Sequence, residues 1–387
     1  MMMREPAYLR RVFFLLTACV CLLSATTHAE PMRAAWVTSV FNLTFPSKAG
    51  LSVERQHAEI VNLVETAKAC GLNALMVQVR PEGDALYKSS LEPWSRTLTG
   101  VQGADPGYDP LAVFLKEGGK RGIEIHAWIN PYRASVNASH ARASNHVASR
   151  YPSEMRKVRN LLWCDPGSVK IQKHTLAVVA DLVGRYPVAG LHLDDYFYPY
   201  PVDASKPEVF PDGATYKAYK ASGGDLGLAD WRRDNVNTLI KRIGETVRKT
   251  RRGCVFGVSP FGTYTKGQPS NVEVKLDQYH QLYADPVLWM REGWVDYLAP
   301  QLYWRNESPQ SFGKLLWWWR HPSNNPRRVP ICPGIAIDRL GGSHDWPVSE
   351  IALQLKLENK IAPAEGYILY DIRPLLSDKK NVRSLFR

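Results

Sequence analysis

Short apolar runs alternate with amphipathic stretches along nearly the whole chain. Several of the stretches between the apolar runs have helical periodicity, among them residues 53–70, 110–122 and 231–249. The apolar runs are rich in Val, Ile and Leu and have the length of strands that are buried on both faces. Eight of them are predicted strands: residues 33–40, 74–81, 124–133, 190–197, 255–262, 297–304, 329–338 and 366–373. Eight strands that alternate with helices predict the α/β class and a closed parallel (β/α)8 TIM barrel.

The lengths of the connections predict a barrel with an elaborated rim. The joins from helix to strand are short, whereas three joins from strand to helix are long, at about residues 134–167, 198–229 and 263–279. In barrels of this kind the active site lies at the carboxyl ends of the strands and is built from those loops. Because no internal repeat, low-complexity tract or interdomain linker interrupts the pattern, we predict one barrel domain over residues 30–387 with long βα loops.

The first 29 residues form a predicted leader. A start that contains arginines is followed by an apolar run at residues 12–25 and by small residues at Thr27 and Ala29, which is the pattern of a cleaved signal peptide. The run is too short for a transmembrane helix, so we expect export across the inner membrane to the periplasm or cell envelope. The stretch around Cys19 also fits a lipoprotein processing site, and lipidation there would instead anchor the chain to the outer membrane.

Cysteine usage and charge narrow the choice of ligands and partners. The cysteines after the leader lie far apart in or beside predicted elements, so we expect free buried thiols; they are Cys70, Cys164, Cys254 and Cys332. Neither a CxxC pair nor a His/Cys cluster indicates a metal site, and we expect no cofactor. The formal net charge of +12 suits an anionic partner. An exported chain meets few nucleic acids, but it meets lipid head groups and cell-wall glycans whose muramic acid units carry carboxylates.

Chemically active side chains collect at the predicted strand ends. Two adjacent aspartates, Asp194 and Asp195, end the fourth strand, where burying either charge is costly unless a proton, a metal or a polar ligand meets it. Aromatic rings, carboxylates and amides around one rim are what a carbohydrate site needs. Single residues also have structural alternatives: Arg80 or Arg373 would pair with a rim carboxylate, and Trp128 would fill the barrel. The remaining candidates are Glu82, Asp84, His126, Asn130, Arg133, His192, Ser259, Gln301, Tyr303, Trp304, Asp338, Arg339 and Asp371.

Five segments resemble the glycosyl-hydrolase-like family ten proteins. They are MRAAWVTSVFNLTFPSK, QVRPEGDALYKSSLEPWSRTLTGVQGADPGYDPL, HAWINPYR, GLHLDDYFYPYP and PQLYW, and the resemblance extends from Met32 to about Asp371. That bacterial group includes the enzyme that digests denuded peptidoglycan glycans. The resemblance implies a (β/α)8 barrel, export to the envelope and hydrolysis of glycosidic bonds in strands from which the stem peptides have been removed. Where related chains tend to have LDPG, this one has CDPG at residues 164–167, which leaves the helix cap intact.

The spacing of the two aspartates favours one catalytic scheme. Ordinary glycosidases place two carboxyl groups about 5–9.5 Å apart across the scissile bond, whereas neighbours on one strand point to opposite faces. N-acetyl sugars can use their own acetamido oxygen as the nucleophile, and the enzyme then needs one carboxylate to orient that amide and another to protonate the leaving oxygen. Adjacent aspartates resemble those of retaining N-acetylglucosaminidases, and by that analogy Asp194 holds the acetamide and Asp195 is the general acid/base, or the reverse. Proximity of like charge is expected to raise the pKa of one of them.

The other candidates are assigned to substrate binding. Tyr196, Tyr198 and Tyr303 would complete a pocket around the acetamide, and Trp128 and Trp304 would stack on sugar rings. The basic loop after the third strand would face muramic carboxylates or remain a solvated basic loop. The further predicted binding residues are Arg80, Asp84, His126, Asn130, Arg133, His192, Gln301 and Asp338.

Three alternatives stay open beside this scheme. A direct-displacement glycosidase would oppose one aspartate of the pair with Asp84, Asp338 or Asp371 across the rim. A metal-dependent carbohydrate deacetylase would bind its ion through His126, His192 and Asp194 and use Asp195 as the base, although no close pair of histidines supports it. A non-catalytic barrel would bind denuded strands and release no product. Either glycosidic bond of the strand and either endo or exo cleavage fits the sequence, and we expect a monomer.

Overall fold

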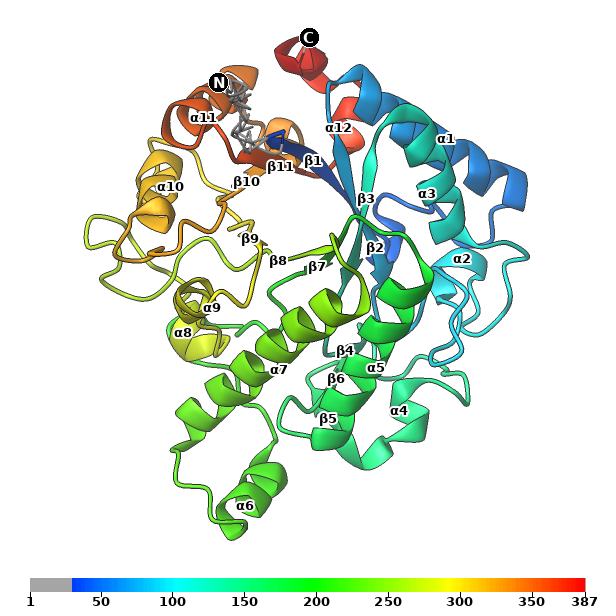
Figure 1. The fold of residues 1–387 in the computed structure, drawn as a ribbon, viewed down its shortest axis with the longest axis vertical. Helices are drawn as coiled ribbons and strands as arrows, with labels where there is room; N and C mark the ends of the chain where they lie inside the picture. The colour runs from blue at the N-terminus through cyan, green and yellow to red at the C-terminus, as the bar shows by residue number, and fades with distance from the viewer. Residues whose placement is uncertain (1–29, 387) are drawn as a thin grey trace, which may run out of the picture. The chain divides into compact units, whose positions relative to one another are not determined.

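Eight parallel strands form the central sheet of the computed structural model, which describes residues 30–386 (Figure 1). Their order in the sheet is β10-β11-β1-β2-β3-β7-β8-β9. They are β1 (Met32–Val37), β2 (Ala74–Arg80), β3 (Glu124–Ile129), β7 (Gly190–Leu193), β8 (Val255–Val258), β9 (Tyr297–Leu298), β10 (Gly334–Ala336) and β11 (Gly366–Tyr370). The predicted α/β barrel is therefore confirmed. The predicted leader, including Cys19, lies outside the described residues.

Isolated pairings close the barrel between β9 and β10. Leu298 pairs with Ile331 and Gln301 with Gly334, and the amide of Gly334 donates to the carbonyl oxygen of Pro300 over 2.8 Å. Prolines in both segments lack the N–H group that a continuous ladder needs. This explains why the regular parts of these two strands are shorter than the apolar runs that predict them.

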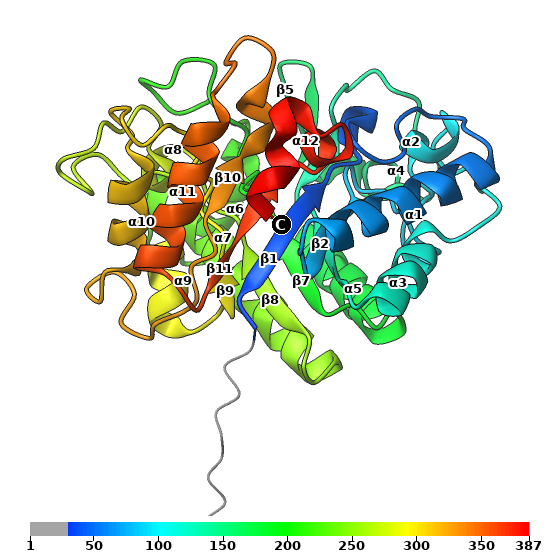
Figure 2. The same cartoon turned by 90° about the horizontal axis from the view of Figure 1, so that it is seen from above.

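Helices cover the outside of the barrel (Figures 1 and 2). The longer ones are α1 (Val53–Ala69), α3 (Pro110–Arg121), α5 (Val169–Arg185), α7 (Leu228–Thr250), α10 (Phe312–Arg320) and α11 (Val348–Ile361). The side chains of Ser52, Asp109 and Ser168 accept hydrogen bonds from backbone amides in the first turns of α1, α3 and α5, which satisfies amides that have no partner within the helix. Among the described residues, no helix combines the length and apolarity that crossing a membrane requires.

Short helices lie in the connections between these elements. The α-helices among them are α2 (Arg96–Thr99), α4 (Val147–Arg150), α6 (Gly213–Ala221), α8 (Gln278–Gln281), α9 (Pro286–Glu292) and α12 (Arg373–Leu376). The 3-10 turns are η1 (Val40–Asn42), η2 (Pro152–Glu154), η3 (Ile337–Leu340) and η4 (Lys379–Phe386).

The inside of the barrel is a packed core below the strand ends. Trp36, Met76 and Tyr297 are buried there in one cluster. Gly190 leaves space for a neighbouring ring, because a Cβ at this position would lie 2.2 Å from Nδ1 of His126. The interior is filled by side chains, as is usual in barrels of this size. The cysteines that follow the predicted leader are also buried; they are Cys70, Cys164, Cys254 and Cys332, and the last three are free thiols.

The connection between β3 and α5 folds into a small antiparallel sheet that the hydrophobic pattern does not predict. Its strands are β4 (Arg133–Ser135), β5 (Met155–Val158) and β6 (Leu161–Cys164), in the order β4-β6-β5. Runs this short show too few alternations to be recognised from sequence. Because β4 follows the end of β3 so closely, the sheet fixes Arg133 at the rim of the barrel.

Candidate active site

A cavity of about 320 Å³ opens at the carboxyl ends of the barrel strands. This volume is at the lower end of the usual range for small-molecule sites, roughly 300–1,000 Å³. The wall consists of Trp36, Thr38, Val40, Phe41, Leu43, Gln78, Trp128, Arg133, Asp194, Tyr196, Ser259, Gln301, Tyr303 and Tyr370. The candidates from the sequence among them are Trp128, Arg133, Asp194, Tyr196, Ser259, Gln301 and Tyr303. The cavity thus lies where the barrel topology places active sites.

Asp194 is the aspartate of the pair that lines the cavity. The alternation along β7 places it on the same side of the strand as His192, toward the barrel axis. The indole N–H of Trp128 donates to its Oδ2 over 3.0 Å, and the side-chain amide of Asn130 donates to its Oδ1 over 2.9 Å. Burial raises the pKa of Asp194, while the charge of Arg133 and these two hydrogen bonds oppose the rise. The carboxyl group is therefore held in one orientation by donors that favour its ionised form.

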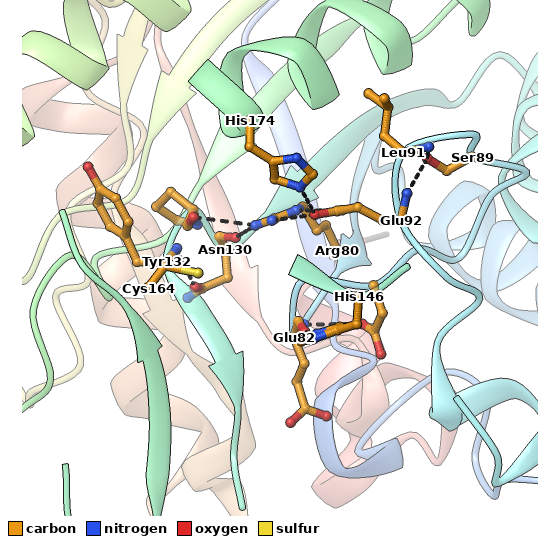
Figure 3. A network of polar contacts seen from close by, with 12 residues as sticks. Arg80, Glu82, Ser89, Leu91, Glu92, Asn130, Tyr132, His146, Cys164 and His174 are labelled. Carbon is orange, nitrogen blue, oxygen red and sulfur yellow. Dashed lines mark hydrogen bonds and ion pairs between the residues drawn. The ribbon is translucent and has the colours of Figure 1, made fainter. Parts of the chain in front are cut away.

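Asn130 owes its own orientation to the backbone around it. Its side-chain oxygen accepts hydrogen bonds from the amides of Tyr132 and Arg133 over 3.2 and 2.6 Å. Because the oxygen is occupied in this way, the NH₂ group points to Asp194. The backbone oxygen of Asn130 accepts a further hydrogen bond from Arg80 (Figure 3). Asn130 does not line the cavity; it positions the carboxylate that does.

Arg80 lies in this network and does not line the cavity, contrary to the prediction of a substrate contact. The register between β2 and β3 shifts between Gln78 and Arg80, and such an irregularity redirects the side chain that follows it. The guanidinium of Arg80 binds the carboxylate of Glu92 through contacts of 2.7 and 2.6 Å, and His174 from α5 contacts the same carboxylate at 2.9 Å (Figure 3). Arg80 therefore pairs with a carboxylate, which is the structural role that the sequence analysis gave as the alternative to a substrate contact.

Asp195 follows the end of β7 and lies beside the cavity without forming part of its wall. Its Oδ2 accepts a hydrogen bond from the phenol of Tyr200, and its Oδ1 has no hydrogen-bond partner among the described residues. Burial raises the pKa of Asp195 to about 7; the charge of Asp194 adds to the rise and the Tyr200 hydrogen bond opposes it. Burial, and not the like charge that the sequence pointed to, is thus the main cause. Tyr200, which donates to Asp195, packs edge-on against Tyr196 of the wall with 5.1 Å between the ring centroids, so one tyrosine ring links Asp195 to the cavity wall.

Gln78 and Arg133 are among the side chains on the cavity wall that have a donor without a partner in the described part of the chain, and the hydroxyl of Thr38 is another. Gln78 accepts with its side-chain oxygen from the amides of Ser39 and Val40 over 3.0 and 2.9 Å, which leaves its Nε2 unpaired. Arg133 donates from Nε to a backbone oxygen over 3.0 Å and lies over the ring of Tyr196 at 5.0 Å, and its Nη2 is unpaired. Buried donors without a partner are rare. Several of them on one wall indicate a ligand that carries several acceptors.

The two predicted histidines lie inside the barrel, below the cavity, and not on its wall. Nε2 of His192 accepts from the indole of Trp36 over 3.1 Å, and its Nδ1 lies 2.8 Å from the hydroxyl of Tyr297. Burial, with a further contribution from His126, lowers the pKa of His192 to about 3. Because both nitrogens of His192 are occupied, the ligand set considered for a deacetylase is not assembled. No group of three His, Cys, Asp or Glu side chains in the described part of the chain is arranged to hold a metal ion.

Three further predicted residues lie behind or beside the wall. Asp84 is buried in the loop after β2, where its Oδ2 accepts from the side chain of Gln102 over 3.0 Å. Tyr198 is buried among aromatic rings. Trp304 packs edge-on against Phe261 with 5.5 Å between the ring centroids. These positions support the loops that surround the cavity.

The carboxylates considered for direct displacement differ in how they are bound. Asp371 accepts from Thr44 over 2.6 Å and from Arg373 over 2.9 Å, and Asp84 is occupied as described above. Asp338 keeps an unpaired Oδ1 and borders a separate hollow of about 270 Å³. Burial, followed by the charge of Asp371, raises the pKa of Asp338 to about 6. Of these three, Asp338 has the most available carboxyl group, but it does not line the main cavity.

Several residues of the wall were not singled out from the sequence. Trp36 and Thr38 lie at the end of β1, Gln78 lies on β2, and Tyr370 ends β11. Each occupies an inward position near a strand end, so the alternation of period two, applied to every strand, would have identified them. Phe41 belongs to the irregular turn after β1 and shows no such signal.

Comparisons with known proteins agree with this architecture. The sequence model of a family described as glycosyl hydrolase-like 10 matches residues 31–346. The chain is 37% identical over 356 residues to "Glycosyl hydrolase YngK" of Bacillus subtilis, across 89% of this chain and 68% of that protein. It is 33% identical over 378 residues to "Glycosyl hydrolase DigH" of Escherichia coli, across 89% of this chain and 84% of that protein.

Two solved structures share the fold at low sequence identity. The glycoside hydrolase domain of PgaB (BpsB) from Bordetella bronchiseptica has a TM-score of 0.58 and 13% identity, covering 92% of this chain and 98% of that one. The endo-beta-1,4-mannanase from Thermotoga petrophila has a TM-score of 0.54 and 11% identity, covering 92% of this chain and 76% of that one. At such identities the likeness shows the barrel fold alone.

Proposed function

Because the chain belongs to the glycosyl hydrolase-like 10 family, we propose that it cleaves β-1,4 glycosidic bonds in peptidoglycan glycan strands and prefers strands without stem peptides. The relatives named as glycosyl hydrolases support the reaction class. The aromatic wall and the unpaired donors of Gln78 and Arg133 support a polar substrate with rings. The proposal includes export to the cell envelope, which the predicted leader supports.

The observation that carries this proposal is the pair of adjacent aspartates with different surroundings. Asp194 lines the cavity with both oxygens hydrogen-bonded, which suits a carboxylate that accepts the N–H of a substrate acetamide and orients it. Asp195 is buried with a pKa of about 7 and an unpaired oxygen, which suits a carboxyl group that gives its proton to the leaving oxygen. The acetamide oxygen then attacks the anomeric carbon as the glycosidic bond breaks, and Asp195, now ionised, takes a proton from the water that opens the intermediate. This sequence retains the anomeric configuration.

The pH dependence of the reaction is expected to follow the two aspartates. Asp195 must be protonated to act as the acid, so kcat/KM should fall about tenfold per pH unit above a pKa of about 7. Asp194 must be ionised to accept the acetamide N–H, so an acid limb should appear, shifted above the ordinary Asp range because burial raises this pKa. Initial rates between pH 4 and pH 9 measure both limbs. A rate that stays constant from pH 6 to pH 9, with the fold intact by circular dichroism, would contradict the role of Asp195.

Mass spectrometry of the soluble products tests the proposed substrate. The mature protein is incubated with peptide-stripped glycan strands and, in parallel, with intact sacculi. We expect fragments from the stripped strands and few or none from the sacculi, and reduction of the new chain ends identifies the bond. Loss of acetyl groups without chain cleavage would instead support a deacetylase. Binding without any product would support a non-catalytic glycan-binding barrel.

A further inference from the structure

One side of the cavity is formed by a turn that exposes two apolar side chains. Phe41, in the turn η1, and Leu43, directly after it, both line the cavity. They are nevertheless 67% and 38% exposed, whereas Val40 in the same turn is buried. The turn therefore packs on the barrel through Val40 and presents Phe41 and Leu43 at the mouth of the cavity.

The backbone holds Phe41 in a conformation that large residues avoid. Its φ and ψ angles are 58° and 14°, and Asn42 follows with a φ of 53°. Left-handed backbone is unfavourable for a residue with a bulky side chain and persists only where the surroundings impose it. Conformations of this kind concentrate at functional sites, so the exposed ring at this position requires an explanation.

Hydrogen bonds on both sides impose this conformation. The side-chain oxygen of Gln78 accepts from the amides of Ser39 and Val40, just before Phe41. The side-chain amide of Asn42, just after it, donates to the backbone oxygens of Pro46 and Thr97 over 2.9 and 2.8 Å. The ring of Phe41 is thus presented by a fixed turn, and a ligand that stacks on it would not have to order the backbone first.

We propose that Phe41 and Leu43 form a second sugar-binding subsite at the mouth of the cavity, where the Phe41 ring stacks on a pyranose ring whose neighbour along the strand occupies the cavity. The inference rests on the proposed function, because it takes the cavity as the place where the bond is cut. A pyranose ring presents C–H groups on its face, which suit apolar contact with an aromatic ring. The cavity, at about 320 Å³, is small for a polymeric substrate, so sugars next to the bound one must leave through its mouth. The subsite makes the enzyme prefer chains over short fragments.

Two substitutions at one position separate the ring from the backbone. Phe41→Asn removes the ring but keeps a residue that tolerates left-handed backbone, and Phe41→Trp keeps an aromatic face. Trp317→Ala is the matched control, because Trp317 is an aromatic residue that is 58% exposed on α10 and does not line the main cavity. The experiment measures kcat and KM on peptide-free glycan fragments of increasing length.

For Phe41→Asn we expect KM for long fragments to rise about two- to tenfold, the range that loss of one aromatic stacking contact gives. The rise in KM should be smaller for the shortest cleaved fragment than for long fragments, and Phe41→Trp and Trp317→Ala should match the wild type. An equal change on short and long fragments, or no change, would overturn the subsite. So would a Phe41→Asn protein that keeps the wild-type dependence on length but loses self-association in gel filtration, which would assign the ring to a contact between copies.

A failure of the proposed function gives a different result. A wild-type protein that cleaves none of the fragments would overturn the hydrolase, whereas the subsite can still be tested by binding. Calorimetric titration of the longest fragment into the wild type and into Phe41→Asn then compares the two affinities directly. Weaker binding by Phe41→Asn supports the subsite, and equal affinities overturn it.

Discussion

Replacing Asp195 with Asn is expected to lower kcat on peptide-free glycan strands by about 10²–10⁴-fold, the contribution that a general acid typically makes. Asp195 has a pKa of about 7 and can donate a proton at neutral pH, whereas the amide of Asn cannot. The substitution should preserve the fold, because an amide oxygen can still accept the hydrogen bond from Tyr200. KM should change little, because the interaction of a general acid with the leaving oxygen strengthens mainly in the transition state. Steady-state kinetics on stripped strands measures the loss, and thermal unfolding checks the fold.

Asp194→Asn is the matched variant that separates the two roles. An N-acetylhexosaminide with an acidic phenol as leaving group needs no protonation of that group. On this substrate Asp195→Asn should recover most of its rate, whereas Asp194→Asn should stay impaired because the acetamide loses the carboxylate that orients it. The reverse pattern would exchange the roles of the two residues. Full activity of Asp195→Asn on glycan strands would remove Asp195 from the chemistry.

The barrel could be predicted because most of its helices and strands have a clear hydrophobic periodicity and because capping residues mark the helix ends. The helix predicted at residues 110–122 is α3, from Pro110 to Arg121. Gly122 caps its C-terminus, and the φ of 67° at this residue is the left-handed geometry that favours glycine. Shorter elements escaped prediction, since β4, β5 and β6 have only three or four residues each. The interruption of β9 and β10 depends on which hydrogen bonds of the ladder are lost because proline has no backbone N–H group. The sequence shows the prolines but not the pairing that they prevent.

The candidate site was predictable where side chains follow the regular alternation of a strand. Asp194 and Trp128 lie on inward positions near the ends of β7 and β3, and both line the cavity. The alternation shows that a side chain points inward but not how far it lies from the mouth of the barrel. It therefore also selected His192, which lies one inward position below Asp194 and has both ring nitrogens engaged in the core. Arg80 departs from the rule for a different reason, because an irregularity in the pairing of β2 with β3 precedes it. Such an irregularity arises from tertiary pairing and leaves no mark in the hydrophobic pattern.

The buried ion pair between Arg80 and Glu92 is expected to contribute strongly to the stability of the fold. Arg80 and Glu92 are both buried and joined by two contacts of 2.7 and 2.6 Å. Burial alone would raise the pKa of Glu92, but the charge of Arg80 reverses this and holds the pKa well below the usual range. Arg80→Met removes the cation and leaves a buried carboxylate with His174 as its remaining side-chain partner. We expect the free energy of unfolding to fall by about 3–5 kcal/mol, the cost typical of breaking a buried ion pair, as measured by urea denaturation.

Two further variants distinguish the lost pair from a simple loss of charge. Lys120→Met removes the cation of a pair at 2.7 Å whose lysine is 55% exposed, and it should change the stability far less because water screens that interaction. Arg80→Met combined with Glu92→Gln should be more stable than Arg80→Met alone, since no carboxylate is then left buried without its guanidinium. Both Arg80 variants should also have a lower kcat, because Arg80 holds the backbone of Asn130, which in turn positions Asp194. If Arg80→Met cost no more stability than Lys120→Met, the network would not fix the cavity, and Arg80 would return to the candidates for direct contact with the substrate.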